Sequence, residues 1–274
     1  MAIVPAEQSR NVMVVGGGPA GLEAARVAAM RGHRVRLFER GSELGGQTLL
    51  AARAPFRDEI GQIVRYYATQ LEKLQVEVRL ESEVTLDLVE RESPDVVIVA
   101  TGSKPLQAGI ETSDAAHVVD ARDVLDGETT LGHRIAIVCR EQHNQALSVA
   151  DFLADKGHEV ELITADLHAG VALEGGTRNR VYHRLLTQNV RITPLVNVRA
   201  VRGKALEATC AITKAERAFD DFDSVVLAFG GEPDGTLGTA LERKGYEVKI
   251  IGDALSPRRI IDATLEGAQA ARAI

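Results

Sequence analysis

The amino-acid sequence predicts an α/β protein built from two related three-layer units of parallel strands and covering helices. At residues 12–30 an apolar strand runs directly into a glycine-rich turn that opens a helix. A similar strand–helix–strand pattern returns 125 residues later in the chain. Uninterrupted apolar runs at 96–100 and 225–228 are typical of parallel strands that are buried on both faces.

The first predicted strand, 11–15, ends in a turn whose three glycines have the spacing GxGxxG. In this pattern the first glycine permits the tight turn, the second lets a pyrophosphate approach the backbone, and the third allows helix and strand to pack closely. The helix predicted over 22–30 directs N–H groups and its dipole toward a phosphate. The predicted phosphate-binding residues are Gly16, Gly18, Pro19, Ala20 and Gly21.

The second predicted strand, 34–38, ends at Glu39, which lies 23 residues after Gly16. A carboxylate at this distance is expected to accept hydrogen bonds from the ribose of an adenosine. A glycine turn without a ligand is the alternative interpretation. Strand, turn, helix, second strand and acid together favour a Rossmann-like dinucleotide-binding unit.

The rest of the first unit is predicted in outline. Loop 40–47 holds two adjacent glycines, which suit either a backbone loop against a flat or phosphorylated ligand or a flexible connector, and the spacing leaves both open. Helical periodicity predicts a helix over 57–74, followed by a short strand over 76–80. Strand 95–100 then ends at Thr101-Gly102, at the sheet edge where ligands approach such units.

The second unit repeats the first. Residues 31–37 resemble residues 156–162, and at the same offset strand 12–15 maps to 137–140. A duplicated αβ unit is the economical interpretation. Further segments follow the repeat, namely a helix predicted over 177–187 and strands over 191–194, 196–201 and 205–212, which suggest a small antiparallel addition.

The repeat has lost the residues that bind phosphate. At the offset of 125, Gly16 becomes Glu141, Gly18 becomes His143 and Gly21 becomes Ala146, while Glu39 becomes Thr164. Glu141 would bring a negative charge close to an incoming pyrophosphate, at a cost on the order of kilocalories per mole. A protonated His143 would offset part of that cost. NAD(P)H is therefore not expected to bind the second unit in the usual pose.

The last strand, 248–251, delivers Gly252-Asp253 to a sheet edge, and a helix follows. The Asp253 carboxylate can accept from a ribitol hydroxyl or contact a phosphate through water. A helix cap is the alternative role.

Composition narrows the function classes. The 274 residues carry 32 Lys and Arg against 39 Asp and Glu, a net charge of −7, which argues against nucleic acid or an anionic membrane as a principal partner. No apolar run approaches the ~18 residues of a membrane span, and Met1–Arg10 has no apolar core of a secretory signal.

Cys139 and Cys210 are too few for an iron–sulfur cluster and too far apart for a CxxC pair. A cytoplasmic protein with no metal site and no catalytic constellation is expected.

The motifs together resemble the two-dinucleotide-binding-domain flavoproteins. The most distinctive match is the run 252–263, GDALSPRRIIDA, together with GPAGLEAAR at 18–26. These runs are similar to the carboxyl-terminal region of old-yellow-enzyme-like oxidoreductases of the trimethylamine dehydrogenase, dimethylamine dehydrogenase and 2,4-dienoyl-CoA reductase type. The resemblance covers about residues 9 to 274.

This resemblance implies two Rossmann-like domains, the second inserted in the first. The expected limits are 1–128 plus 241–274 for an FAD- or ADP-binding domain and 129–240 for a degenerate NAD(P)-binding-like domain. The fingerprint and Glu39 would hold the ADP moiety, and the loop with Gly46 would lie along the cofactor. Beyond the fingerprint and Glu39, the expected cofactor-binding residues are Arg40, Gly46, Gln47, Val84, Ala100, Thr101, Gly102, Gly252, Asp253 and Ala263.

The same resemblance implies an oxidoreductase role, but this chain holds only some of the domains and cofactor motifs of the relatives. The relatives carry an amino-terminal barrel with FMN and a cysteine-rich iron–sulfur motif, and this chain holds neither. The first hypothesis is therefore an FAD-binding subunit that relays electrons to or from a separate FMN/iron–sulfur barrel subunit acting on an amine- or enoate-type substrate. A non-redox module that binds ADP is the second hypothesis. A stand-alone NAD(P)H-dependent flavin reductase is the third, and the replacements at Glu141, His143 and Ala146 argue against it.

Overall fold

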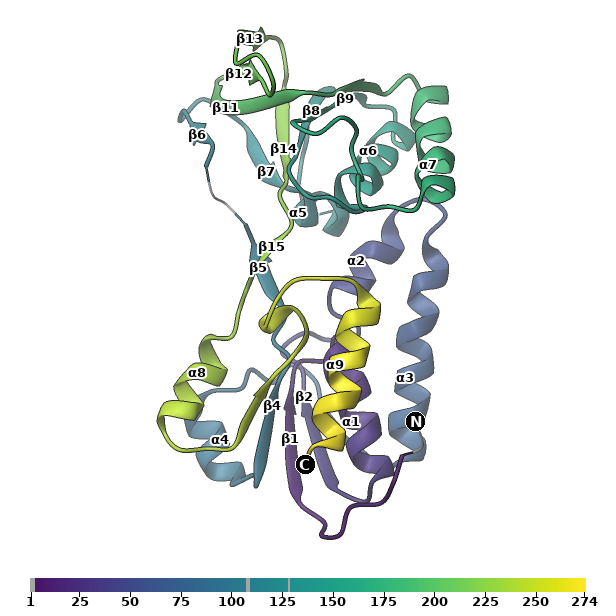
Figure 1. The fold of residues 1–274 in the computed structure, drawn as a ribbon, viewed down its shortest axis with the longest axis vertical. Coiled ribbons are helices and arrows are strands. Elements are labelled where there is room, and N and C mark those ends of the chain that lie inside the picture. Colours follow the sequence, from purple (N-terminus) through teal and green to yellow (C-terminus); the bar gives the residue numbers. More distant parts are fainter. Residues whose placement is uncertain (1–2, 107–108, 128) are drawn as a thin grey trace. The chain divides into compact units, whose positions relative to one another are not determined.

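The computed structural model describes residues 3–106, 109–127 and 129–274, and in it the chain divides into two compact units (Figure 1). The first unit consists of Met1–Leu49, Glu59–Lys104 and Gly231–Ile274, and the second of Leu50–Asp58 and Pro105–Gly230. The mixed α/β class expected from the sequence is confirmed.

The first unit is built on a five-stranded parallel sheet. Its strand order is β16-β4-β1-β2-β3. Strand β1, which leads into the glycine turn, therefore lies beside β2, which follows the helix after that turn. Asn11 pairs with Arg34 and Val15 with Phe38 along the central pair. The strands are β1 (Asn11–Val15), β2 (Arg34–Phe38), β3 (Glu77–Arg79), β4 (Val96–Val99) and β16 (Val248–Ile250).

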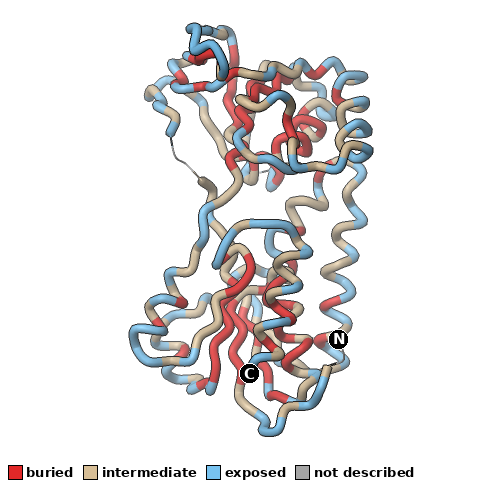
Figure 2. Tube along the Cα trace, in the orientation of Figure 1, coloured by how far each residue is buried: buried red, intermediate tan, exposed pale blue. Residues whose placement is uncertain are grey.

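Alternate side chains of β1 enter different layers. Val12 and Val14 pack with helices α1 (Pro19–Met30), α3 (Gly61–Lys73) and α9 (Ile260–Arg272) on one face. Met13 and Val15 pack with α4 (Leu86–Glu92) and α8 (Thr236–Arg243) on the other face. Figure 2 shows the central strands β1 and β4 as buried over most of their length. Helices on both faces bury all four residues of β4, which explains its uninterrupted apolar run.

The second unit repeats this strand order. Its five parallel strands follow one another as β7-β14-β8-β9-β10, and each occupies the place of its counterpart β16, β4, β1, β2 or β3. This order supports a duplicated αβ unit. The strands are β7 (Val118–Asp120), β8 (Arg134–Cys139), β9 (Glu159–Thr164), β10 (Arg191–Thr193) and β14 (Ser224–Ala228).

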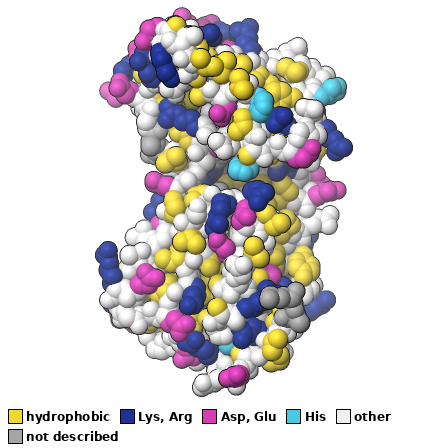
Figure 3. All heavy atoms as spheres, viewed as in Figure 1, with side chains coloured by type: hydrophobic (Ala, Val, Ile, Leu, Met, Phe, Trp, Pro, Cys, Tyr) yellow, Lys and Arg dark blue, Asp and Glu magenta, His cyan; other side chains and the backbone are white. Residues whose placement is uncertain are grey.

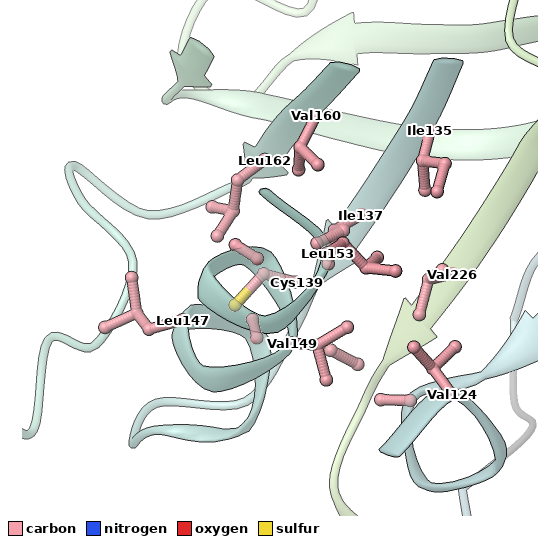
Figure 4. Packing of buried hydrophobic residues seen from close by; sticks show 14 of the residues in the cluster. Val124, Ile135, Ile137, Cys139, Leu147, Val149, Leu153, Val160, Leu162 and Val226 are labelled. Atoms are coloured by element: carbon pink, nitrogen blue, oxygen red, sulfur yellow. The ribbon is translucent and has the colours of Figure 1, made fainter. Parts of the chain in front are cut away.

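The two faces of the second sheet are covered differently. Ile135, Ile137 and Cys139 of β8 pack on helices α5 (Ala121–Asp126) and α6 (Gln145–Asp155), as Figure 4 shows. The opposite face packs against a second sheet with an antiparallel addition of three strands, which the sequence predicted only in part. The expected strand 191–194 does not belong to it, because β10 pairs parallel with β9, and the third antiparallel strand, over Glu216–Phe219, was not predicted. This sheet contains β6 (Glu111–Thr112), β11 (Val196–Arg202), β12 (Ala205–Cys210) and β13 (Glu216–Phe219).

The remaining elements are short apart from one helix. Residues 57–74 do not form one helix, because a 3-10 turn over Asp58–Ile60 precedes α3. Strand β12 ends at Cys210 rather than at residue 212. The other elements are α2 (Gln47–Arg53), α7 (Gly175–Thr187), the paired strands β5 (Ser103–Pro105) and β15 (Gly231–Pro233), and a 3-10 turn over Gly252–Ala254.

The unit limits differ from the expected domain limits at 128 and 240. Strand β7 and helix α5 precede residue 128, but β7 belongs to the parallel sheet of the second unit and α5 to the helices that cover it. Helix α8 begins before residue 240 but packs in the first unit through Leu241. No helix within the described ranges is long and apolar enough to cross a bilayer.

Candidate dinucleotide site

Two glycines of the fingerprint are required by the fold itself. Gly16 has φ +106°, and a Cβ there would lie 2.3 Å from the carbonyl oxygen of Ala100. A Cβ at Gly21 would lie 2.0 Å from the carbonyl oxygen of Gly16. These two positions admit only glycine because backbone atoms of the turn and of Ala100, directly after β4, approach too closely for any side chain.

Gly18 is different, because its missing side chain leaves open space. A Cβ added there would meet no described atom within 4 Å, and its φ of −78° is accessible to any residue. Gly18 is the N-cap of α1, and the first intrahelical bond runs from the Leu22 N–H to its carbonyl at 2.9 Å. The N–H groups of Ala20 and Gly21 come before that bond, and α1 has no acidic residue in its first turn. The helix therefore presents donors and the positive end of its dipole toward open space.

Glu39 lies next to this turn. Its Oε2 accepts from the Gly17 N–H at 2.7 Å, and its Oε1 accepts from the Gly41 N–H at 2.7 Å. A carboxylate has about four acceptor positions, so two remain for a ribose diol. The sequence placed Glu39 at the end of β2, and the structure brings it to Gly17, between the first two glycines of the fingerprint.

The glycine loop after β2 packs directly on the turn. The Gly45 N–H donates to the Gly17 carbonyl at 2.8 Å, and a Cβ at Gly46 would lie 3.3 Å from the Cα of Gly18. Gly45 and Gly46 have φ values of +129° and +52°. The structure thus supports the interpretation as an ordered backbone loop over the interpretation as a connector.

Three polar side chains meet at the edge of the same sheet. The Gln47 Nε2 donates to the Ser103 Oγ and to the Asp253 Oδ2, both at 3.1 Å. The Asp253 Oδ1 accepts from the Arg258 N–H at 3.2 Å. Asp253 does not cap the last helix, because the N-cap of α9 is Arg259. Gln47 and Asp253 come from distant parts of the chain, and the fold joins them as one polar group.

The Gly252 turn is supported by residues that the sequence did not reveal. Gly252 has φ +62°, and a Cβ there would lie 2.7 Å from the Ala20 Cβ. Its N–H donates to the Glu266 Oε2 at 2.8 Å, and Arg258 forms an ion pair with the other oxygen of Glu266. Glu266 lies fourteen residues further on in α9, and no spacing rule singles it out.

The remaining predicted residues have mixed surroundings. Thr101 donates its hydroxyl to the Asp234 carbonyl at 2.6 Å. The Ala263 Cβ would lie 3.8 Å from a Cβ placed at Gly252. Val84 is half-buried in the apolar layer that contains Met13 and Val15, and Arg40 is exposed. Ala100 is buried, and half-buried Gly102 has φ +82°.

The corresponding turn of the second unit has different chemistry. The Glu141 carboxylate accepts from the His143 N–H at 2.5 Å and from the Ala146 N–H at 3.0 Å, at the start of α6. Burial raises the pKa of Glu141, and the hydrogen bonds from Ala146 and His143 oppose that shift. Burial also raises the pKa of the Cys139 thiol, to about 12, so this cysteine is not a reactive thiolate.

Neither the surface charge nor the metal-ligating side chains in the described part of the chain indicate a further site. Figure 3 shows acidic and basic side chains interspersed on the face in view. Among the described residues, no group of three or more His, Cys, Asp or Glu side chains could hold a metal ion. The glycine turn of the first unit is therefore the candidate site.

Fold and site together define a protein with two Rossmann-like α/β units, of which one retains an open dinucleotide turn. The chain belongs to the pyridine nucleotide-disulphide oxidoreductase family, whose model matches residues 10–253.

Similar proteins lie among larger oxidoreductases. The chain is 38% identical to the N,N-dimethylglycine/sarcosine dehydrogenase of Chromohalobacter salexigens, over 85% of this chain and 35% of that protein. It is 29% identical to the dimethylamine dehydrogenase of Hyphomicrobium sp. (strain x), over 98% of this chain and 42% of that protein. The expected resemblance to amine dehydrogenase-type flavoproteins is confirmed.

Solved structures of larger oxidoreductases also match the fold of this chain. A 2-naphthoyl-CoA reductase in complex with 2-naphthoyl-CoA matches with a TM-score of 0.92 and 29% identity, over 100% of this chain and 41% of that chain. Histamine dehydrogenase from Rhizobium sp. 4-9 matches with a TM-score of 0.92 and 26% identity, over 100% of this chain and 45% of that chain. The chain thus spans less than half the length of these relatives.

Proposed function

We propose that the first unit binds FAD, with the ADP part of the cofactor on the glycine turn. The observation that carries this proposal is the open space at Gly18, beside the N-terminus of α1 and next to Glu39. Gly16 and Gly21 are explained by internal packing, whereas a side chain at Gly18 would meet no described atom within 4 Å. A ligand that approaches the backbone there explains a glycine at this position.

Each part of the site has a role in this proposal. The N–H groups at the start of α1 and the bare backbone of Gly18 would hold the pyrophosphate. The free acceptor positions of Glu39 would receive the ribose hydroxyls. Gln47 and Asp253 form a polar pair suited to the ribityl hydroxyls. When bound, the flavin supplies one- and two-electron transfer, while the chain binds and orients it.

We further propose that the chain is one subunit of a heteromeric oxidoreductase. It matches relatives over only 35–45% of their length, and those relatives include amine dehydrogenases and a CoA-thioester reductase. A separate barrel-type subunit with FMN and an iron–sulfur cluster would provide the substrate site for an amine- or enoate-type substrate. The FAD of this chain would relay electrons to or from that subunit.

The test begins with the purified protein and its visible spectrum, before and after addition of FAD. Released ligand is identified by mass spectrometry. Bound FAD supports the proposal. ADP without flavin selects a non-redox nucleotide-binding module, and a protein that stays colourless with added FAD refutes flavin binding.

Purification of the complex from its native source tests the second half of the proposal. A co-purifying barrel-type protein that contains FMN and an iron–sulfur cluster supports the heteromeric role. A flavoprotein that is bleached by NADH without any partner selects a stand-alone flavin reductase instead.

A further inference from the structure

The second unit has kept the shape of a nucleotide-binding unit but not its open turn. Strand β8 leads through residues 140–144 into α6, at the place where β1 leads through the glycine turn into α1. Glu141 occupies the position of Gly16 at the offset of 125 residues. The backbone N–H groups of Arg140 and Glu141 bond to the Ala228 carbonyl, at 3.0 and 3.3 Å, which anchors this turn to β14.

The Glu141 side chain folds back onto the helix that follows it. One carboxylate oxygen accepts from the His143 N–H and the other from the Ala146 N–H. Ala146 corresponds to Gly21 of the first unit, so its N–H is one of the donors that a pyrophosphate would use in an intact fingerprint. The carboxylate thus bonds to donors that a ligand phosphate would otherwise occupy.

A second side chain closes the adjacent space. The Gln145 Oε1 accepts from the Gly230 N–H at 3.0 Å, and Gly230 follows β14 as Gly102 follows β4. A Cβ at Gly230 would lie 3.7 Å from the Glu141 Cβ, so the Glu141 side chain also packs against this strand end. In the first unit the residues at these two positions are Gly16 and Ala20, neither of which carries a long side chain.

We infer that Glu141 and Gln145 close the second dinucleotide site from within, with the Glu141 carboxylate as the resident anion of the α6 N-terminus. The sequence alone indicated repulsion between Glu141 and an incoming pyrophosphate. The structure adds that the backbone donors are already bonded and that the approach to β14 is filled.

The experiment uses the full-length chain with Gly18→Glu as background, so that the first site does not contribute and the result is independent of whether that site holds FAD. Binding of NADH is measured by calorimetry for this background and for the same chain with Glu141→Gly and Gln145→Ala. The background is expected to bind NADH weakly, and the added substitutions are expected to lower the Kd at least about tenfold. Equal NADH affinity of the two folded proteins refutes the inference.

A second measurement covers the case in which the glycine variant does not fold. Amide resonances of His143 and Ala146 are followed while inorganic pyrophosphate is added to the wild-type chain and to Glu141→Ala, which removes both the carboxylate and the side chain that fills the turn. These two resonances are expected to shift in Glu141→Ala and to stay in place in the wild type. Saturable shifts in the wild type would overturn the inference, as would their absence in both proteins.

Discussion

Substitution of Gly18 separates a glycine that serves a ligand from glycines that serve the fold. For Gly18→Ala, the new Cβ meets no described atom within 4 Å, and φ is −78°. Alanine in place of glycine at an N-cap costs about 0.5–1 kcal/mol. The smaller entropy of the unfolded chain returns about 0.4–1 kcal/mol. The free energy of unfolding of the apoprotein is therefore expected to change by less than about 1 kcal/mol.

Nucleotide affinity is expected to respond in the opposite way. The alanine methyl group occupies the side of the turn that a pyrophosphate approaches, so the Kd for ADP and FAD is expected to rise about 10–100-fold, or about 1.4–2.7 kcal/mol. Gly18→Glu adds a negative charge and is expected to abolish binding. Calorimetric titration with ADP measures both variants, since ADP carries the pyrophosphate and ribose that the site is expected to recognise.

Two control variants bracket this result. Gly16→Ala places a methyl group 2.3 Å from the Ala100 carbonyl oxygen at a φ of +106°, so it is expected to destabilise the apoprotein by at least about 2 kcal/mol in urea unfolding. Gly175→Ala, at the first position of α7, also adds a Cβ into open space and is expected to leave ADP affinity unchanged. An unchanged Kd for ADP in folded Gly18→Ala would show that no pyrophosphate approaches this turn.

Three further substitutions test the surroundings of the site and the second unit. Glu39→Gln removes the charge that is proposed to bind the ribose, so ADP affinity is expected to fall about tenfold, since hydrogen bonds to charged groups contribute about 1.5–3 kcal/mol. Equal affinity in calorimetry contradicts this role. Glu266→Ala leaves the Gly252 N–H without its acceptor and is expected to lower the free energy of unfolding by about 1–3 kcal/mol, with Glu266→Gln less damaging; identical urea midpoints for Ala and wild type argue against it. The Lys204 ammonium lowers the pKa of Asp223 to about 2, so Asp223 stabilises the fold above about pH 4 and this contribution is lost as the pH falls toward 2. The stability difference between wild type and Asp223→Asn is expected to shrink over that range, and a difference independent of pH would refute the assignment.

Local patterns predicted the centre of each unit well. The apolar residues of β1 and β4, the glycine turn and the alternation in β2 each indicate an element that the structure contains. The internal repeat also indicated the two central strands of the second sheet, because β1 and β2 map at the fixed offset onto β8 and β9. The places of the other strands do not follow from that offset, since β16 comes last in the chain whereas β7, which has the same place in its sheet, precedes β8. Short elements such as α4 and α8 were not predicted, since helices of seven and eight residues depend mainly on tertiary packing.

Site residues that directly follow a strand could be predicted from the sequence. Contacts between residues from distant parts of the chain could not. Glu39 and Asp253 follow strands β2 and β16, so their place at a sheet edge could be expected. The bond from Gly252 to Glu266 depends on how α9 packs on the turn, which no local pattern contains. The sequence likewise identified Glu141 by its position in the repeat, but the direction of its side chain depends on the backbone around α6.

The two turns show how one fold can lose a ligand and keep its helix. The N–H groups at the start of a helix need acceptors, whether these come from water, a side chain or a ligand. In the first unit the glycine turn leaves such groups to an external anion, whereas in the second unit Glu141 supplies a carboxylate from within the chain. A replacement that removes the phosphate site therefore also stabilises the helix that the phosphate would have contacted. Because both effects come from one side chain, the second unit does not need a nucleotide to complete the N-terminus of α6.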